Sequence, residues 1–136
     1  MKDYDFSCWA IRYDRVSARD LRYMKNCLKH NDGKIVPLIW SHEHYNHTSV
    51  LGYATLEHRE EGIYVYCKLN DTPFNDYVRE MLSDRGRLSI SPFVNGVKID
   101  GINVLSGNIA EVSLVFARDV PDELYYPVMK TDELSI

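Results

Sequence analysis

VLGYATL (residues 50–56) and IYVYCKL (residues 63–69) decide the fold of this 136-residue chain. Both runs are rich in the β-branched and aromatic residues that favour strands. A short polar stretch, His58 to Gly62, separates them, so the two runs are predicted to form a β-hairpin. Gly52 lies inside the first strand, where a glycine is typical of a bulge or of the close approach of another backbone.

Further strand-like runs lie on both sides of this hairpin. Upstream, FSCWAIRYDRV (6–16) alternates apolar and charged residues as a half-buried strand does. KIVPLIW (34–40) is short and apolar, and its Pro37 favours an edge position or a first-half strand. Downstream lie a strand over 87–94, a hairpin around Asp100-Gly101 and the apolar run 108–116. About seven strands are therefore expected.

Two helices are expected beside these strands. In the first, Ser17 is a candidate N-cap, Leu21 and Leu28 recur at helical spacing, and Asn31-Asp32-Gly33 ends the segment. In the second, Thr72 is the candidate N-cap and Pro73 takes the first helical position. Its apolar residues follow at helical spacing and Gly86 ends it; they are Phe74, Tyr77, Val78, Met81 and Leu82.

This order of elements predicts an α+β fold, in which a mostly antiparallel sheet or barrel of about seven strands carries flanking helices. The length fits one domain. We assign residues 1–120 to that domain and residues 121–136 to a C-terminal tail that we expect to be mobile, because the sequence turns polar after Arg118 and contains Pro121 and Pro127.

Charge and composition exclude several classes of protein. The net charge is −4 and the pI near 5.7, which argues against nucleic acid as a partner because such proteins carry a basic face. No apolar run approaches the ~20 residues that span a bilayer, so no membrane association is expected. Cys8, Cys27 and Cys67 are widely spaced and odd in number, which favours reduced thiols in an intracellular protein.

Three strand-like stretches carry residues that suit nucleophilic catalysis. LSISPF (88–93) places a small hydroxyl, Ser89, inside an apolar strand. His42 follows the strand that ends at Trp40 and is a candidate base, and Glu111 is a candidate orienting acid. A serine attacks a carbonyl when a base takes its proton, and the base works best when a third group orients it.

A metal site is the alternative chemistry. His42, His44 and His47 have the pattern H-x-H-x-x-H near a strand end, which could hold zinc and leave a position for water. No cysteine lies nearby and the nearest acid is Glu43, so the expected cofactor is none. A surface loop of histidines explains the same pattern without any metal.

The ordered set of motifs resembles the tailed-phage prohead proteases, the capsid-maturation serine proteases thought to share a fold with the herpesvirus assemblins. The resemblance extends from about Phe6 to Arg118. It is carried by FSCWAIRYDRV, KIVPLIWSHEH, the hairpin from VLGYATL to CKL, TPFNDYVREMLSDRG, LSIS and GNIAEVSLV. It implies an assemblin-like fold and the activity of a serine endopeptidase.

The resemblance also implies roles for individual residues. His42 matches the base, Ser89 the nucleophile and Glu111 the acid of the last strand. Arg118 follows that strand and is a candidate oxyanion donor.

The chain departs from the family pattern beside the candidate nucleophile. Ser91, followed by Pro92, stands where the family has a glycine directly after the Ser-Ile of the nucleophile strand, so Ser91 is an alternative nucleophile. His44 is an alternative base, because alternation along a strand would place it on the same side as His42. Ala117 to Pro121 replaces the usual Pro-Ala segment after the last strand.

The function expected from the resemblance is processing of phage scaffold and major capsid protein, and of the chain itself, in the host cytoplasm inside an assembling procapsid. A homodimer or an assembly-dependent oligomer is the expected state. The alternative from the same fold is a catalytically inactive module that binds scaffold or capsid protein, and a zinc-binding hydrolase is the further alternative.

Overall fold

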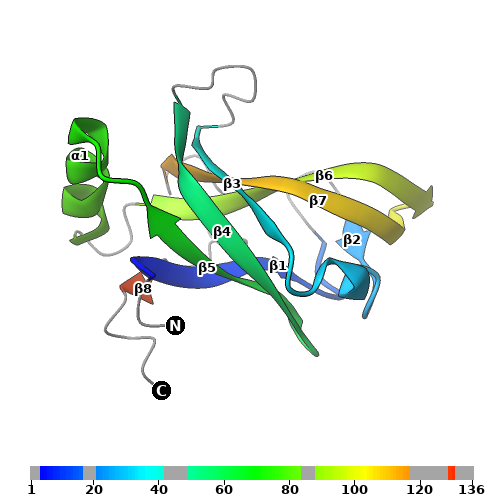
Figure 1. Cartoon of the computed structure of the whole chain (residues 1–136). Coiled ribbons are helices and arrows are strands. Elements are labelled where there is room, and N and C mark those ends of the chain that lie inside the picture. Colours follow the sequence, from blue (N-terminus) through cyan, green and yellow to red (C-terminus); the bar gives the residue numbers. More distant parts are fainter. Residues whose placement is uncertain (1–3, 17–20, 42–48, 84–87, 117–128, 131–136) are drawn as a thin grey trace.

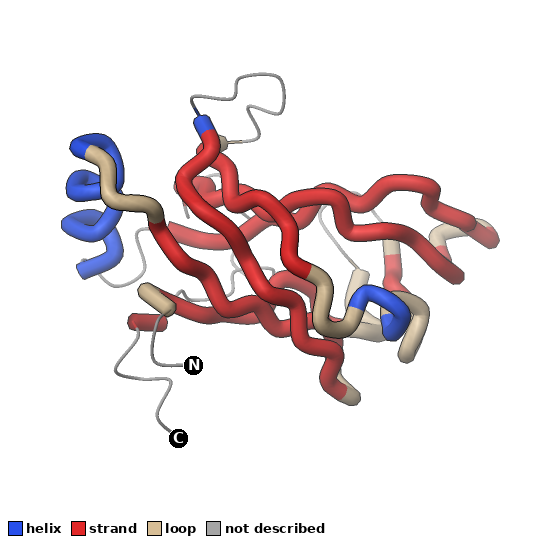
Figure 2. Tube along the Cα trace, viewed as in Figure 1, coloured by secondary structure: helices blue, strands red, loops and turns tan. Residues whose placement is uncertain are grey.

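The computed structural model describes residues 4–16, 21–41, 49–83, 88–116 and 129–130, and these form one sheet curled into a half-barrel with one α-helix (Figure 1). Figure 2 shows that strands make up most of the described chain. The mostly antiparallel α+β architecture expected from the sequence is therefore confirmed in outline. The elements are β1 (Phe6–Arg12), β2 (Arg22–Tyr23), a 3-10 helix (Lys29–Asn31), β3 (Ile35–Trp40), β4 (Val50–Arg59), β5 (Gly62–Leu69), α1 (Pro73–Ser83), β6 (Leu88–Asp100), β7 (Asn103–Phe116) and β8 (Met129–Lys130).

The strands follow the order β2-β7-β3-β4-β5-β1-β8, and β6 pairs with β7. The two expected hairpins are present as β4–β5 and β6–β7, and Gly101 has a φ of +64° in the second turn. The second hairpin is longer than expected, because its strands continue through the segments that the sequence pattern separated. Two pairings are parallel, β2 with β7 and β3 with β7.

Strand β7 has partners along both edges. One edge pairs with β6 along nearly its whole length. The other edge pairs with β2 at residues 103–104 and with β3 at residues 112–114. Between those two pairings the buried side chain of Asn31 takes the place of a strand. Its amide donates to the Gly107 carbonyl over 3.2 Å, and its oxygen accepts from the Ile109 N–H over 3.0 Å.

The core lies inside the curl of the sheet. It contains Phe6, Cys8, Leu38, Leu56, Val65, Leu88, Ile90, Val112 and Leu114 among others, all of them 4% exposed or less. Helix α1 packs against this core through Val78, which has no exposed surface. In Figure 1 the helix stands at the end of the half-barrel where β3 and β7 finish.

The second predicted helix is confirmed. Helix α1 begins at Pro73, and the Thr72 hydroxyl accepts from the Asn75 N–H over 3.1 Å, as an N-cap does. Asn75 adds a second tie, because its buried amide donates to the Leu51 carbonyl over 2.8 Å. The stop expected at Gly86 lies outside the described residues.

The first predicted helix is wrong over the residues that the structure describes. Instead of a helix over 21–30, Arg22 and Tyr23 form β2, and only Lys29–Asn31 form a 3-10 turn. Asn26 has a φ of +63°, which interrupts helical geometry. The apolar residues have helical spacing, but this segment pairs with β7 instead. The Arg22 side chain strengthens that pairing, because it donates two hydrogen bonds to Asn103 Oδ1. The candidate cap Ser17 lies outside the described residues.

The edge position predicted for KIVPLIW is also wrong, because β3 lies between β7 and β4. The Lys34 carbonyl accepts from the Leu56 N–H on the β4 side, so by alternation Pro37 faces the β7 side. Pairing with β7 starts only at Leu38. The missing N–H of Pro37 therefore falls where β3 needs no donor, which is why a proline is tolerated inside the sheet.

The tail contributes one described element. Strand β8 pairs antiparallel with β1, with Met129 opposite Ser7 and Lys130 opposite Phe6. In the described part of the chain, no helix is both long and apolar enough to cross a membrane.

Replacing Asn31 with alanine should lower the free energy of unfolding by about 2 to 4 kcal/mol, because it leaves the Gly107 carbonyl and the Ile109 N–H buried without partners. Urea unfolding measures the change. Asn108→Ala is the matched control, since that exposed amide meets His30 Nε2 at the surface, and it should cost less than about 0.5 kcal/mol. Equal effects of the two substitutions would contradict the role given to Asn31.

Replacing Gly52 with alanine should destabilise the protein by more than about 3 kcal/mol or prevent folding. A Cβ at this position would lie 1.8 Å from the Lys68 carbonyl oxygen, so β4 and β5 would have to separate. Gly33→Ala is the comparison, because its φ is +78° and no atom lies within 4 Å of the added carbon. It should cost only about 1 to 2 kcal/mol of backbone strain. Thermal unfolding of both variants measures the two losses of stability.

Candidate functional site

Ser89 lies on β6 and faces away from the core. Its neighbours Leu88 and Ile90 both belong to the core, so alternation turns the serine to the opposite side of the sheet. Ser89 nevertheless has no exposed surface, and its hydroxyl has no hydrogen-bond partner among the described residues. A buried hydroxyl without a partner costs about 1 to 3 kcal/mol, and such groups concentrate at functional sites.

The surroundings of Ser89 on that face are small and mostly apolar. Val115 of β7 pairs directly with Ser89, and Ser113 pairs with Ser91. Ile39 of β3 pairs with Ser113, whose hydroxyl donates to the Ile39 carbonyl over 3.4 Å. Ile39, Ser113 and Val115 are buried, but they lie outside the main core cluster to which Leu88 and Ile90 belong. Ser91 is half-buried on the same face and so remains the alternative nucleophile.

The end of β3 lies level with Ser89, across β7. Trp40 pairs with Leu114, and the Ser41 N–H donates to the Leu114 carbonyl over 2.9 Å. The next residue of β7, Val115, is the partner of Ser89. Two strand spacings separate the backbones of Ser41 and Ser89, about 10 Å. Ser41 has a φ of +50°, a conformation unusual for serine that turns the chain out of β3.

Several predicted site residues lie outside the described part of the chain. His42 and the alternative base His44 follow directly after Ser41, and Arg118 follows two residues after β7. The zinc site predicted at His42, His44 and His47 also falls there. Among the described residues, no three His, Cys, Asp or Glu side chains are grouped as metal ligands. The base, the oxyanion donor and the zinc site stay predictions.

Glu111 shares the face of Ser89 but not its immediate surroundings. It pairs with Phe93 and is half-buried. Because Val115 is the partner of Ser89, Glu111 lies four residues along β7 from the nucleophile level, about 14 Å. The structure does not bring the two side chains into contact. An acid in this position could serve only through an imidazole placed between it and Ser89.

The thiols offer no competing nucleophile at neutral pH. Burial raises the pKa of Cys8 and Cys67 far above the ordinary value for a thiol. Burial also raises the pKa of Cys27 to about 11. Since the thiolate is the reactive form, all three cysteines stay protonated and inert.

Sequence reasoning missed an aromatic cluster on the same strands, which lies on the core face of the sheet, opposite to the face of Ser89. The Trp40 ring meets Phe74 of α1 edge-on, with centroids 5.6 Å apart, and meets Phe116 of β7 likewise at 5.5 Å. The helical spacing predicts Phe74 and Tyr77 as part of a buried stripe, but they are 46% and 66% exposed. Their position at the first turns of α1, above strand ends, could be found only by placing the helix on the sheet.

No protein-family model, no curated protein and no solved structure matches this chain.

Replacing Ser89 with alanine should raise the free energy of unfolding by about 1 kcal/mol, because it removes a buried hydroxyl that has no hydrogen-bond partner in the described part of the chain. Ser113→Ala is the matched control on the neighbouring strand. It removes a hydroxyl that donates to Ile39, so it should lower the free energy by about 0.5 to 1 kcal/mol. Urea unfolding measures both changes. A loss of stability at Ser89 equal to that at Ser113 would show that the Ser89 hydroxyl is satisfied.

Proposed function

We propose that this protein is a serine endopeptidase of the tailed-phage prohead protease type, with an assemblin-like fold. The observation that supports it is the Ser89 hydroxyl, which is buried, has no hydrogen-bond partner among the described residues and lies level with the end of the strand that leads to His42. A hydroxyl that makes no structural hydrogen bond can donate one to a catalytic base. Most buried polar groups have a hydrogen-bond partner, so one without a partner needs an explanation.

In the proposed reaction the His42 imidazole takes the proton of Ser89 as its oxygen attacks the carbonyl carbon of the scissile peptide. The imidazolium then gives that proton to the leaving amine, which leaves an acyl-enzyme on Ser89. Water, deprotonated by the same imidazole, releases the acyl group and restores the serine. Glu111 orients the imidazole, and Arg118 balances the negative charge on the carbonyl oxygen.

The proposed substrates are the scaffold and major capsid proteins of a phage, together with the chain itself. The proposed setting is an assembling procapsid in the host cytoplasm, where the protein acts as a homodimer or as part of the assembly. These partners are inferred from the resemblance of the ordered motifs to the prohead proteases.

A fluorophosphonate probe tests the proposal, because it forms a stable adduct only with an activated serine. The adduct should appear on Ser89, as read by peptide mass spectrometry, and His42→Ala should reduce it by a factor of at least about 100. Ser113 is the internal control, since it is equally buried on the adjacent strand and should stay unlabelled. The labelling is done on the isolated protein and in co-expressed procapsids.

An adduct on Ser91 would keep the enzyme and move the nucleophile by two residues along β6. Absence of any serine adduct in both preparations would overturn the proposal.

The complete burial of Ser89 favours a second candidate, a catalytically inactive module of the same fold that binds scaffold or capsid protein. A nucleophile must meet its substrate, and this side chain has no exposed surface. The second candidate predicts procapsid assembly without cleavage and without an adduct, so the same labelling experiment separates the two.

A further inference from the structure

We propose that Trp9, Arg12 and Arg59 form a docking site for an acidic segment of a partner protein. A carboxylate of the partner accepts hydrogen bonds from the Arg12 guanidinium in this site, which we call the Trp9 site. It lies on the outer face of β1, β4 and β5. The proposal does not rest on the endopeptidase function, because Ser89 lies on β6 and takes no part in the site.

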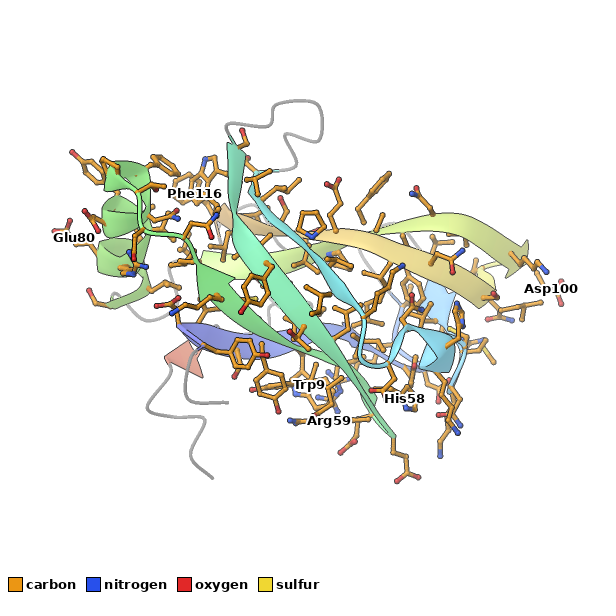
Figure 3. The ribbon with its side chains drawn as sticks, viewed as in Figure 1. Trp9, His58, Arg59, Glu80, Asp100 and Phe116 are labelled. Carbon is orange, nitrogen blue, oxygen red and sulfur yellow. The ribbon has the colours of Figure 1, made fainter. Side chains whose placement is uncertain are left out.

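The pairing of β1, β5 and β4 brings the two arginines to one ring. Arg12 and Arg59 both pair with Gly62, one from each side of β5, so they lie in one row across the sheet. Gly62 puts no side chain between them. The guanidinium carbons of Arg12 and Arg59 lie 4.6 Å and 5.4 Å from the ring centroid of Trp9. Figure 3 shows Trp9 and Arg59 next to each other on the outside of the sheet.

The Trp9 ring faces away from the core and is held in place. Ile63 and Val65 belong to the core, so alternation along β5 turns Tyr64 outward, and Trp9 is its partner on β1. The two rings meet edge-on, with centroids 5.2 Å apart. Because edge-to-face contacts favour one arrangement of the rings, Trp9 offers an ordered surface.

Arg59 is a fixed wall of the Trp9 site. Its Nε donates to Glu57 Oε1 over 2.5 Å, and its Nη2 donates to the Tyr66 hydroxyl over 2.9 Å. Its guanidinium carbon also lies 3.9 Å from the centroid of Tyr64. The Glu57 carboxylate therefore balances the charge of Arg59, and these contacts hold the side chain in one position.

Arg12 is the group that can bind an anion. In the part of the chain that the structure describes, it lies over Trp9 and makes no ion pair. The acids of the adjoining turns are exposed, and they are Asp14, Glu60 and Glu61. Glu60 pairs with Lys25, at 3.1 Å. A guanidinium has five N–H donors in one plane, and stacking on the indole orients that plane before a carboxylate arrives. Such preorganisation lowers the entropic cost of binding.

The composition of the site favours a protein over a nucleic acid. Trp, Tyr and Arg are the residue types enriched at the centres of protein interfaces. Bases need open aromatic faces on which to stack, but Tyr64 and Tyr66 are each only 7% exposed. A phosphate backbone would also bring many negative charges to a chain whose net charge is −4. A segment with a few carboxylates is repelled less and matches the one arginine that has no acidic partner within the described ranges.

Peptide titration tests the proposal. Trp40→Phe leaves Trp9 as the sole tryptophan of the chain, which has two, so the emission reports on the site. This protein is titrated with two acetylated and amidated octapeptides that alternate threonine with glutamate or with glutamine. The glutamate peptide should change the emission saturably and bind at least about tenfold more tightly than the glutamine peptide, because charge-assisted hydrogen bonds are the stronger ones. Calorimetric titration of the wild type checks both affinities.

Substitution of Arg12 should abolish the selection. Arg12→Gln should weaken binding of the glutamate peptide about tenfold and leave binding of the glutamine peptide unchanged. Arg15→Gln is the matched control, because Arg15 is exposed three residues further along the chain and its replacement removes the same charge. It should change either affinity by less than about twofold.

Three results would overturn the proposal. The first is equal binding of the two peptides, or no saturable binding of either. The second is an equal effect of Arg12→Gln and Arg15→Gln, which would show attraction to the overall charge alone. The third is binding of oligothymidylate that is tighter than binding of the glutamate peptide and is lost in Arg12→Gln, which would assign the site to single-stranded nucleic acid.

Discussion

Pairing along both edges of β7 holds this half-barrel together. One edge is served by a contiguous hairpin partner, β6, and the other by two short strands with a gap between them. A buried backbone cannot leave that gap empty, because unpaired N–H and C=O groups are costly away from water. The amide of Asn31 fits the gap, since it carries one donor and one acceptor side like a peptide group. Lys34 adds a further donor to the Ile109 carbonyl over 2.7 Å.

The candidate site lies on the three strands that this pairing brings together. Strands β6, β7 and β3 are adjacent only because β7 accepts β3 in parallel, and this places Ser89 and Ser41 at one level. The Ser89 hydroxyl, which has no hydrogen-bond partner within the described ranges, is a local cost in stability that the surrounding strand pairings offset. Stability lost at one side chain is a common feature of sites that act on other molecules.

Local sequence patterns correctly predicted the elements that depend on interactions between residues close together in the chain. The β4–β5 hairpin, the Asp100-Gly101 turn and the capped start of α1 each follow from residues within a few positions of one another. The failed elements depend on remote partners. Residues near Leu21 and Leu28 have helical spacing, but Arg22 and Tyr23 pair with a strand that begins at Asn103. Pro37 predicted an edge strand, but β3 lies inside the sheet. The proline is tolerated there because the β3–β7 pairing starts only at Leu38.

The same division holds at the site. Ser89 stood out in the sequence as a small hydroxyl in an apolar strand. In the part of the chain that the structure describes, its hydroxyl is one of four buried side-chain atoms without a hydrogen-bond partner, together with Tyr13 OH, His58 Nε2 and Asn75 Oδ1. The distance of Glu111 from Ser89 along β7, and the cluster around Trp40, come from register and from the placement of α1. Neither can be read from spacing within one segment.

The order of the strands along the chain has a consequence for synthesis on the ribosome. Ile39 of β3 bonds to Ser113 of β7, which is 74 residues later. At ~5–20 residues per second, β3 waits roughly 4 to 15 seconds for that partner. During this time its free edge would be a template for pairing with other nascent chains. Pro37 faces that same edge and lacks the donor such pairing needs, so the residue tolerated in the finished sheet also protects the unfinished one.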